Sequence, residues 1–152
     1  RNLGEACHIY DVFTFLTGAE VKKISALSIG NDEEIFGRNE NFSTTISFND
    51  GSIGNLTYTS LGSRAYPKEI FHVFCDQSVF YLNNYRNLEI FGPLEEKYST
   101  DVTEKGHLKE LETFLRSVRG EYDWPIPLWQ QVQATRIALE VEKQIASGVT
   151  SP

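Results

Sequence analysis

Residues 42–60 read FSTTISFNDGSIGNLTYTS, and this stretch decides the fold. Its first half alternates apolar side chains with serine and threonine, a period of two that is typical of a half-buried β-strand. The turn sequence Asn49-Asp50-Gly51-Ser52 follows, and Asp-Gly is a strong hairpin signal. The return strand should run from Ile53 to about Ser60. The stretch therefore predicts an antiparallel β-hairpin.

Further strands are expected on both sides of this hairpin. Residues 21–29 should form a strand before it, and after Pro67, which has no amide donor, short segments rich in β-branched and aromatic residues follow. These segments span 69–75, 79–82 and 88–91, and the short turns between them favour antiparallel pairing. The polar stretch 93–105 is expected to be an exposed loop or a flap.

Apolar residues at steps of three and four predict helices over residues 4–17, 106–119 and 128–147. Helices segregated from strands indicate an α+β fold over residues 1–152, taken as a single domain. We expect a largely antiparallel sheet of five or six strands, with helices packed on one face. Because several strands are apolar on both sides, the other face should be available for oligomerisation or for another part of the protein.

Composition narrows the class of protein. The 152 residues contain 14 Lys and Arg against 21 Asp and Glu, and the basic residues are scattered, so we expect no nucleic-acid partner. No apolar run is long enough for a membrane span and no signal peptide is recognisable, so we expect a cytoplasmic protein without a membrane partner. Two reduced thiols, Cys7 and Cys75, are favoured over a disulfide between them, which the sequence leaves open.

The chain contains no methionine and opens at Arg1, shortly before a predicted helix. We interpret it as a piece of a longer protein, with proteolytic maturation as the alternative. No two glycines are separated by one residue and no glycine precedes a lysine, which excludes both the G-x-G-x-x-G fingerprint and the P-loop. If the parent protein is an enzyme, its nucleotide site should lie mainly outside these residues.

His8 is the leading candidate for chemistry. Glu5 lies three residues before it and Asp11 three residues after, so all three should share one face of the first helix. Carboxylates beside an imidazole can hold its tautomer and tune it for proton transfer. The alternative is structural: Glu5 caps the helix while Asp11 forms a surface ion pair. A metal site would need a second Glu-x-x-His copy, which is absent.

Other polar residues are weaker candidates for binding. Arg64 and Tyr66 lie in a loop bounded by glycine and proline, and Lys105 and His107 flank the start of the second predicted helix. Such groups can hold hydroxyls, carboxylates or phosphates, although surface loops and a solvated helix end are the alternatives. His72 lies on an apolar strand face, and we expect it to be a hydrogen-bonded core residue.

Four pieces of the sequence carry a resemblance. They are GEACHIYDVFTFLTG at 4–18, FNDGSIGNLTYTS at 48–60, KGHLKELETFLRSVRG at 105–120 and WPIPLWQQVQATRIALEVE at 124–142. In this order they resemble the C-terminal domain of the glucose–fructose oxidoreductase / inositol dehydrogenase / MocA family along nearly the whole chain. That family joins an N-terminal Rossmann domain, which binds NAD(P), to a C-terminal α/β domain carrying substrate residues and the oligomer interface.

The resemblance implies roles for particular residues. His8 matches the histidine of the family's D-x-x-x-H motif, but the position four before it is Gly4, and the acidic Glu5 lies one residue away. We therefore expect His8 and Glu5 to be catalytic, with Glu5 orienting the imidazole. Hydroxyls or a phosphate of the substrate should be held by Arg64, Tyr66, Lys105 and His107.

The resemblance also implies an activity for the whole protein. The parent should transfer hydride between NAD or NADP and a hydroxyl carbon of a sugar, nucleotide-sugar or cyclitol, as a homo-oligomer formed through the open sheet face. This chain alone should bind no cofactor and be inactive. The alternative is a non-enzymatic dimerisation or ligand-binding module, and a third reading is a self-contained fold with a closed apolar pocket.

Overall fold

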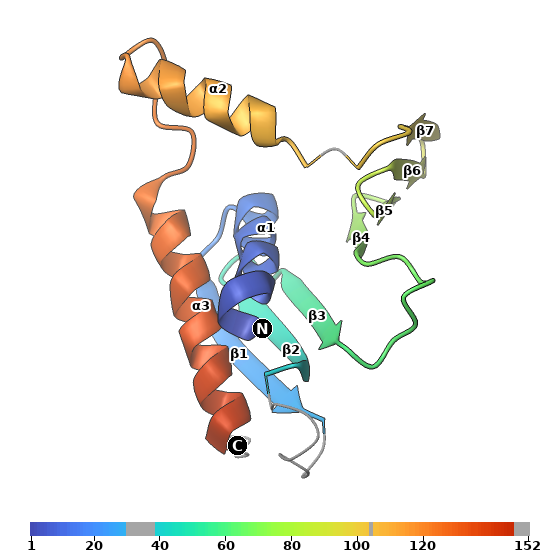
Figure 1. Ribbon diagram of the computed structural model, residues 1–152, viewed down its shortest axis with the longest axis vertical. Helices are drawn as coiled ribbons and strands as arrows, with labels where there is room; N and C mark the ends of the chain where they lie inside the picture. The colour runs from blue at the N-terminus through green and yellow to red at the C-terminus, as the bar shows by residue number, and fades with distance from the viewer. Residues whose placement is uncertain (30–38, 104, 148–152) are drawn as a thin grey trace. The chain divides into compact units, whose positions relative to one another are not determined.

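The computed structural model describes residues 1–29, 39–103 and 105–147 (Figure 1). The chain divides into two compact units, of which unit 1 comprises Arg1–Leu61 and Ile126–Pro152 and unit 2 comprises Gly62–Pro125. Each unit has its own antiparallel sheet. The expectation of one domain over 1–152 stays a prediction, because two compact units can still fold together.

Unit 1 is a three-stranded sheet with helices against it. Its elements are the π-helix η1 (Asn2–Ala6), α1 (Cys7–Thr17), β1 (Val21–Ser28), β2 (Asn41–Phe48), β3 (Ile53–Thr59) and α3 (Leu128–Ser147). The strands follow the order β1-β2-β3, and the β2–β3 pair is the hairpin that the sequence predicts. Helix α3 contacts both α1 and β1, and Figure 1 shows the two helices side by side over the sheet.

The core of unit 1 follows the period of two along β2. Phe42, Thr44, Ile46 and Phe48 are buried, whereas Ser43 and Thr45 are exposed. The buried side chains meet apolar residues from both helices, namely Ala6, Tyr10, Ile137, Ala138, Val141 and Ile145. The alternation thus places a serine- and threonine-rich face outside and the core beneath α1 and α3.

Gly54 brings α1 close to the sheet. A Cβ atom added to this β3 residue would lie only 2.6 Å from Cδ2 of Phe13, on α1. Glycine is therefore needed here for close approach rather than for a turn. This contact sets the distance between α1 and β3. It therefore also helps to position His8, the predicted site residue on α1.

Two glutamines of α3 protect the outer edge of β1. Gln133 accepts a hydrogen bond from the amide of Val21 (3.0 Å). Gln144 accepts one from the amide of Ala26 (2.9 Å) and donates one to the carbonyl oxygen of Ile24 (3.2 Å). An edge strand otherwise presents unpaired backbone groups that invite pairing with another chain. The α3 side chains replace the missing neighbour strand.

Unit 2 is a four-stranded meander followed by a helix. Its elements are β4 (Ile70–Cys75), β5 (Ser78–Asn83), β6 (Asn87–Phe91), β7 (Glu96–Ser99) and α2 (His107–Val118), with the sheet order β4-β5-β6-β7. The stretch 93–105 is expected from the sequence to be an exposed loop or a flap, but it contains β7, and residue 104 lies outside the described residues. The α+β class is confirmed, with the strands of the described chain split between two sheets.

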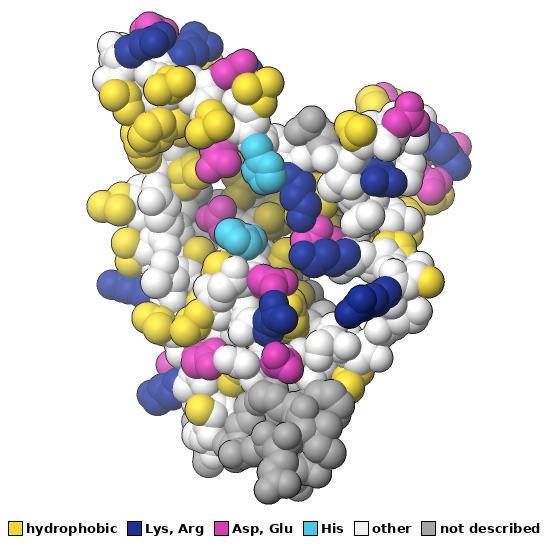
Figure 2. Space-filling view, viewed as in Figure 1, with side chains coloured by type: hydrophobic (Ala, Val, Ile, Leu, Met, Phe, Trp, Pro, Cys, Tyr) yellow, Lys and Arg dark blue, Asp and Glu magenta, His cyan; other side chains and the backbone are white. Residues whose placement is uncertain are grey.

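The described part of unit 2 contains no buried residue. Helix α2 carries the predicted apolar stripe, but its side chains are exposed: Leu108 by 70%, Leu111 by 60%, Leu115 by 51% and Val118 by 64%. Figure 2 shows hydrophobic side chains gathered over this helix. Helix packing onto a sheet face therefore holds for α1 and α3, whereas α2 buries none of its residues.

Candidate functional site

His8 is an exposed residue in the first turn of α1. The neighbour that interacts with it electrostatically is Asp11, one turn later on the same helix. Partial burial raises the pKa of Asp11 above its ordinary value, and the positive charge of His8 opposes this rise. An accessible imidazole therefore has a carboxylate beside it, at the spacing that the sequence predicts.

Glu5 has other partners. Its Oε1 pairs with Nη1 of Arg1 at 2.7 Å, and its Oε2 accepts a hydrogen bond from the Tyr58 hydroxyl at 2.9 Å. Partial burial and this bond to the carboxylate raise the pKa of Tyr58. Glu5 thus ties η1 to β3, whereas Asp11 lies beside His8. The orienting role of Glu5 stays a prediction.

The π-helix at the start of the chain explains part of this difference. The amide of Cys7 donates to the carbonyl oxygen of Asn2, a five-residue step that is wider than that of an α-helix. The rule that residues three apart share a face holds for α-helical geometry. Glu5 lies inside the π-turn, so its spacing to His8 does not follow that rule. The Asp11 spacing lies wholly within α1.

A buried network holds the base of α1. The Tyr10 hydroxyl donates to Oδ1 of Asn2 at 2.8 Å, and Nδ2 of Asn2 donates to the carbonyl oxygen of Ala138 at 2.7 Å and to Glu142 at 2.9 Å. Asn2 and Tyr10 are both fully buried. Satisfied buried hydrogen bonds fix one geometry because breaking them leaves polar atoms without partners. His8 is therefore carried on a rigid support.

The four predicted binding residues lie in unit 2, in different surroundings. Arg64 is exposed in the loop before β4, and His107 is the exposed first residue of α2. Lys105 binds both carboxylate oxygens of Glu69, at 3.0 and 2.8 Å, and lies 4.7 Å from the ring centre of Tyr85. Its ammonium group is thus already engaged.

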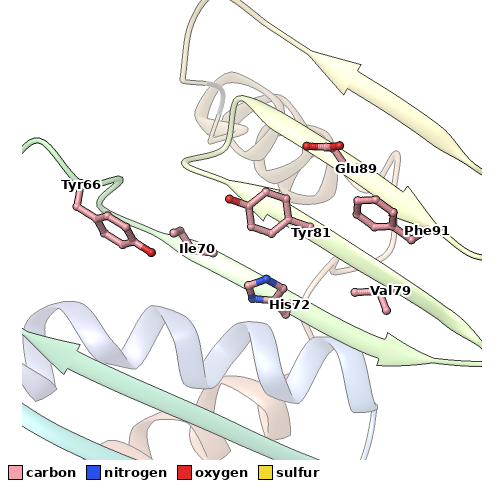
Figure 3. A pocket seen from close by; sticks show the side chains of 7 residues that line it. All are labelled: Tyr66, Ile70, His72, Val79, Tyr81, Glu89 and Phe91. Atoms are coloured by element: carbon pink, nitrogen blue, oxygen red, sulfur yellow. The ribbon is translucent and has the colours of Figure 1, made fainter.

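Tyr66, the last of these four, lines an open hollow of about 480 Å³ on the sheet of unit 2. The other residues lining it come from β4, β5 and β6, and Figure 3 shows their side chains on one face: Ile70, His72, Val79, Tyr81, Glu89 and Phe91. The prediction that His72 is a core residue is wrong, because its side chain is exposed beside Tyr81. The prediction rested on the apolar neighbours of His72 along the strand. The face of β4 that carries His72 is exposed to solvent.

Sequence reasoning did not propose Tyr81 and Glu89 as site residues. A signal for them existed, because alternation along each strand assigns residues to faces, but the pairing register between strands was unknown. In the sheet of unit 2, His72 pairs with Tyr81 and Tyr81 with Glu89 as direct cross-strand neighbours. Register is a long-range property, so spacing along the chain could not supply it.

The next features concern metal sites, disulfides and membrane-spanning helices within the described residues. Nowhere in 1–29, 39–103 or 105–147 do three His, Cys, Asp or Glu side chains form a group able to hold a metal ion. Cys7 and Cys75 are free thiols. No helix within the described chain has the length and apolar character needed to cross a bilayer.

The described residues lack the features of a Rossmann dinucleotide site. A Rossmann site uses parallel strands, a glycine-rich turn and the start of a crossover helix. Both sheets in the described chain are antiparallel throughout, and the glycine fingerprint is absent from the sequence. The described elements therefore do not form a Rossmann-type dinucleotide site.

Neither a protein-family model nor a curated protein sequence matches this chain. Its fold matches that of solved oxidoreductases. UDP-N-acetylglucosamine 3-dehydrogenase GnnA from Acidithiobacillus ferrooxidans is 17% identical with a TM-score of 0.78, and the match covers 93% of this chain and 46% of that one.

Two further structures are similar. Biliverdin reductase from Synechocystis sp. PCC 6803, in complex with biliverdin and NADP+, is 15% identical with a TM-score of 0.69, covering 93% of this chain and 45% of that one. The WlbA dehydrogenase from Bordetella pertussis, in complex with NADH and UDP-GlcNAcA, is 14% identical with a TM-score of 0.58, covering 97% and 44%.

This chain therefore has a fold found in NAD(P)-dependent oxidoreductases, and it spans slightly less than half the length of these proteins. The resemblance to the C-terminal domain of the glucose–fructose oxidoreductase / inositol dehydrogenase / MocA family is confirmed at the level of the fold.

Proposed function

We propose that this chain is the substrate-binding half of an NAD(P)-dependent dehydrogenase that acts on a hydroxyl of a sugar, nucleotide-sugar or cyclitol. The observation that carries the proposal is His8, an exposed imidazole with Asp11 beside it, on a helix of a dehydrogenase-type fold. NAD or NADP would be held by residues outside this chain, so the chain alone would be inactive.

The chemistry assigned to His8 is proton transfer. Oxidation of an alcohol to a ketone releases the hydroxyl proton, and a base within hydrogen-bond reach accelerates the reaction by accepting it. The imidazole of His8 would accept this proton, and in the reverse direction it would donate one. A neighbouring carboxylate favours the protonated imidazole, so Asp11 would stabilise the product state of the transfer.

The residues of unit 2 would contribute to substrate binding. Arg64, Tyr66 and His107 are exposed and can donate hydrogen bonds to hydroxyl or phosphate oxygens. Lys105 could bind a phosphate only by leaving Glu69. We therefore rank Lys105 last among the four.

The proposal includes a homo-oligomer formed through an open sheet face. The outer face of unit 1 is exposed, with serine, threonine and asparagine bonded across strands, as in the bond from Thr45 to Asn55 at 2.8 Å. The sheet of unit 2 has no buried side chain in its described part. Both observations fit surfaces that a second copy would cover.

One similar structure binds biliverdin, which is not a sugar, so the fold is compatible with more than one substrate. A non-enzymatic dimerisation or ligand-binding module remains the alternative function. This alternative would also use the open sheet faces of unit 1 and unit 2, but it gives His8 no catalytic role.

The test uses the parent protein with its dinucleotide-binding half. His8→Ala should lower kcat by about 10²-fold or more if the imidazole transfers the proton. Phe15→Ala, at an exposed position of the same helix, is the matched control and should leave kcat nearly unchanged. Turnover by His8→Ala close to that of the parent would favour the non-enzymatic module.

A second pair of variants separates the two carboxylates. Asp11→Asn should shift the pH profile of kcat/KM, because the interaction between His8 and Asp11 is lost. Glu5→Gln should instead lower the stability, because it weakens the contacts to Arg1 and Tyr58. A pH profile altered by Glu5→Gln and unaffected by Asp11→Asn would restore Glu5 as the orienting residue.

A further inference from the structure

The two outer edges of the sheet in unit 1 differ in how they are protected. Strand β1 carries two exposed lysines, Lys22 and Lys23, and has a register shift in its pairing with β2. Side chains of α3 also bond to its backbone. Lysines, bulges and covering elements all keep an edge strand from pairing with another chain. The sheet order β1-β2-β3 makes β3 the opposite edge (Figure 1).

Strand β3 has none of these protections. Its sequence, IGNLTYT, contains no charged residue and no proline, and its register with β2 is continuous from Ile53 to Thr59. A regular, uncharged edge of this length readily accepts a further strand. We propose that this edge pairs with β3 of a second copy of the chain, antiparallel and about a two-fold axis at Leu56. The inference rests on the homo-oligomer of the proposed function and names the strand that joins the copies.

The hydrogen bonds of the hairpin identify the backbone groups of β3 that point outward. The amide of Phe48 donates to the carbonyl oxygen of Ser52 at 2.9 Å, so the backbone of Ser52 faces β2. The backbone groups of successive residues in a strand point to opposite edges, and every second residue after Ser52 therefore faces β2 as well. The N–H and C=O groups of the residues between them point to the outer edge, namely Ile53, Asn55, Thr57 and Thr59.

A two-fold axis at Leu56, the middle residue of β3, makes this edge complementary to itself. Antiparallel pairing about the axis places Asn55 opposite the second copy's Thr57, and the outward backbone groups of both residues can exchange hydrogen bonds. Leu56, which packs against the core of unit 1, would lie opposite its own counterpart, where no backbone bond is needed. This register pairs all seven residues of the strand.

Side chains and charge also fit a second copy. Within the sheet, Oγ1 of Thr45 donates to Oδ1 of Asn55 at 2.8 Å. Nδ2 of Asn55 can donate in turn to the hydroxyl of the second copy's Thr57, which would extend this polar row across the new pair. The net charge of −7 makes two copies repel each other, but an uncharged strand brings no like charges opposite one another.

The length of the edge sets the expected strength of the contact. Two strands of seven residues bury less surface than a standard specific interface, which covers about 1,200–2,000 Å². Interfaces below this range are weak and reversible. We therefore expect a monomer–dimer equilibrium with a Kd of about 100 μM.

The experiment measures self-association of the intact chain by sedimentation equilibrium, from well below to well above about 100 μM. Thr57→Pro removes an outward-pointing amide and leaves the bonds to β2 in place, and it should weaken the dimer by about tenfold or more. Ser25→Lys, at an exposed position on β1, is the control for association through the outer sheet face. It should leave the dimer intact, because edge pairing does not cover β1.

Hydrogen exchange gives a second readout that needs no variant, so the inference can be tested even if Thr57→Pro does not fold. The amides of Asn55 and Thr57 point outward, and their exchange should slow as the protein concentration rises. The amide of Leu56 faces β2, and its exchange should be slow at every concentration.

Three results would overturn the inference. One is a folded chain that stays monomeric well above about 100 μM. Another is protection of the Asn55 and Thr57 amides that does not depend on concentration, which would show that the same chain covers the edge. The third is a dimer that survives Thr57→Pro and is lost in Ser25→Lys. His8→Ala should lower turnover of the parent without changing the dimer, so the failure of the dehydrogenase function and the failure of this contact are distinguishable.

Discussion

The two units of this chain share one sheet type but differ in what holds them together. Unit 1 has a closed core between β2 and two helices, with Phe42, Ile46 and Val141 fully buried. The strands of unit 2 are richer in hydrophobic residues than those of unit 1, yet Phe74 on β4 is 74% exposed and no described side chain of the unit is buried. Since burial of apolar surface is the main driving force of folding, unit 1 can supply its own stability, whereas unit 2 needs further surface to cover it.

The comparison also separates two kinds of candidate site. The His8 site rests on the buried network of Asn2 and Tyr10, so its geometry is held by the core. The hollow around Tyr81 rests on a sheet held by backbone pairing and by half-buried side chains. A rigid support suits proton transfer, which depends on distance, and an open face suits weak binding.

The largest predicted difference is between two phenylalanines. Phe42→Ala removes a fully buried ring and should lower the free energy of unfolding by about 3–5 kcal/mol. Phe74→Ala removes an exposed ring and should change it by no more than about 0.5 kcal/mol. Urea unfolding followed by circular dichroism gives both values. A large loss for Phe74→Ala would show that unit 2 is covered in solution, which would break the comparison.

The next prediction concerns the buried network under His8. Tyr10→Phe leaves Oδ1 of Asn2 without its donor in a buried place and should cost about 1–3 kcal/mol. Tyr122→Phe in unit 2 is the control, because its parent residue is 56% exposed, and it should be nearly neutral. If thermal unfolding showed the same loss of stability for both variants, the conclusion that unit 1 holds most of the stability would be contradicted.

The sequence predicted the elements better than it predicted their grouping. The hairpin at 42–60, the strands near 70–75 and 78–83 and the helix at 128–147 follow from local periodicity, and the structure confirms them. The division into two sheets does not follow, because periodicity identifies a strand but not its partner. Strand β7 was missed, since its sequence EKYS is exposed throughout and its pairing with β6 leaves no hydrophobic pattern.

For the candidate site, local spacing succeeded where it stayed within one regular helix. The interaction between His8 and Asp11 follows from a three-residue step in α1. One partner of Glu5, Tyr58, is 53 residues further along the chain, and no local rule reaches it. The pairing of His72, Tyr81 and Glu89 across the strands required the sheet register. In both cases the missing information was long-range contact.

A smaller effect is expected at the protected edge of β1. Gln144→Ala removes two hydrogen bonds to the backbone of β1 and should cost about 1–2 kcal/mol. Lys143→Ala, at the exposed neighbouring position of α3, should be nearly neutral. Hydrogen exchange at the Ala26 amide gives a local readout, since it should speed up in the first variant only. Unchanged exchange would show that water replaces Gln144 without loss.

The smallest predicted effect is at the hairpin turn of unit 1. Asp50 accepts hydrogen bonds from the amide and the hydroxyl of Ser52, at 3.0 and 2.7 Å, and these bonds lower its pKa. A lowered pKa gives stability that is present above the ordinary aspartate value and is lost as the pH falls through the folded value. The stability difference between the parent chain and Asp50→Asn should therefore vanish in acid. A difference that is constant with pH would contradict this origin.

The order of the two units along the chain affects synthesis on the ribosome. Strand β1 leaves the ribosome before α3, which protects its edge and lies on the far side of Gly62–Pro125 in the sequence. At about 5–20 residues per second, translation of the intervening segment takes roughly 3–13 s. During that interval the edge of β1 is open and the core lacks the side chains of α3, so this is the period in which we expect chaperones to engage the chain.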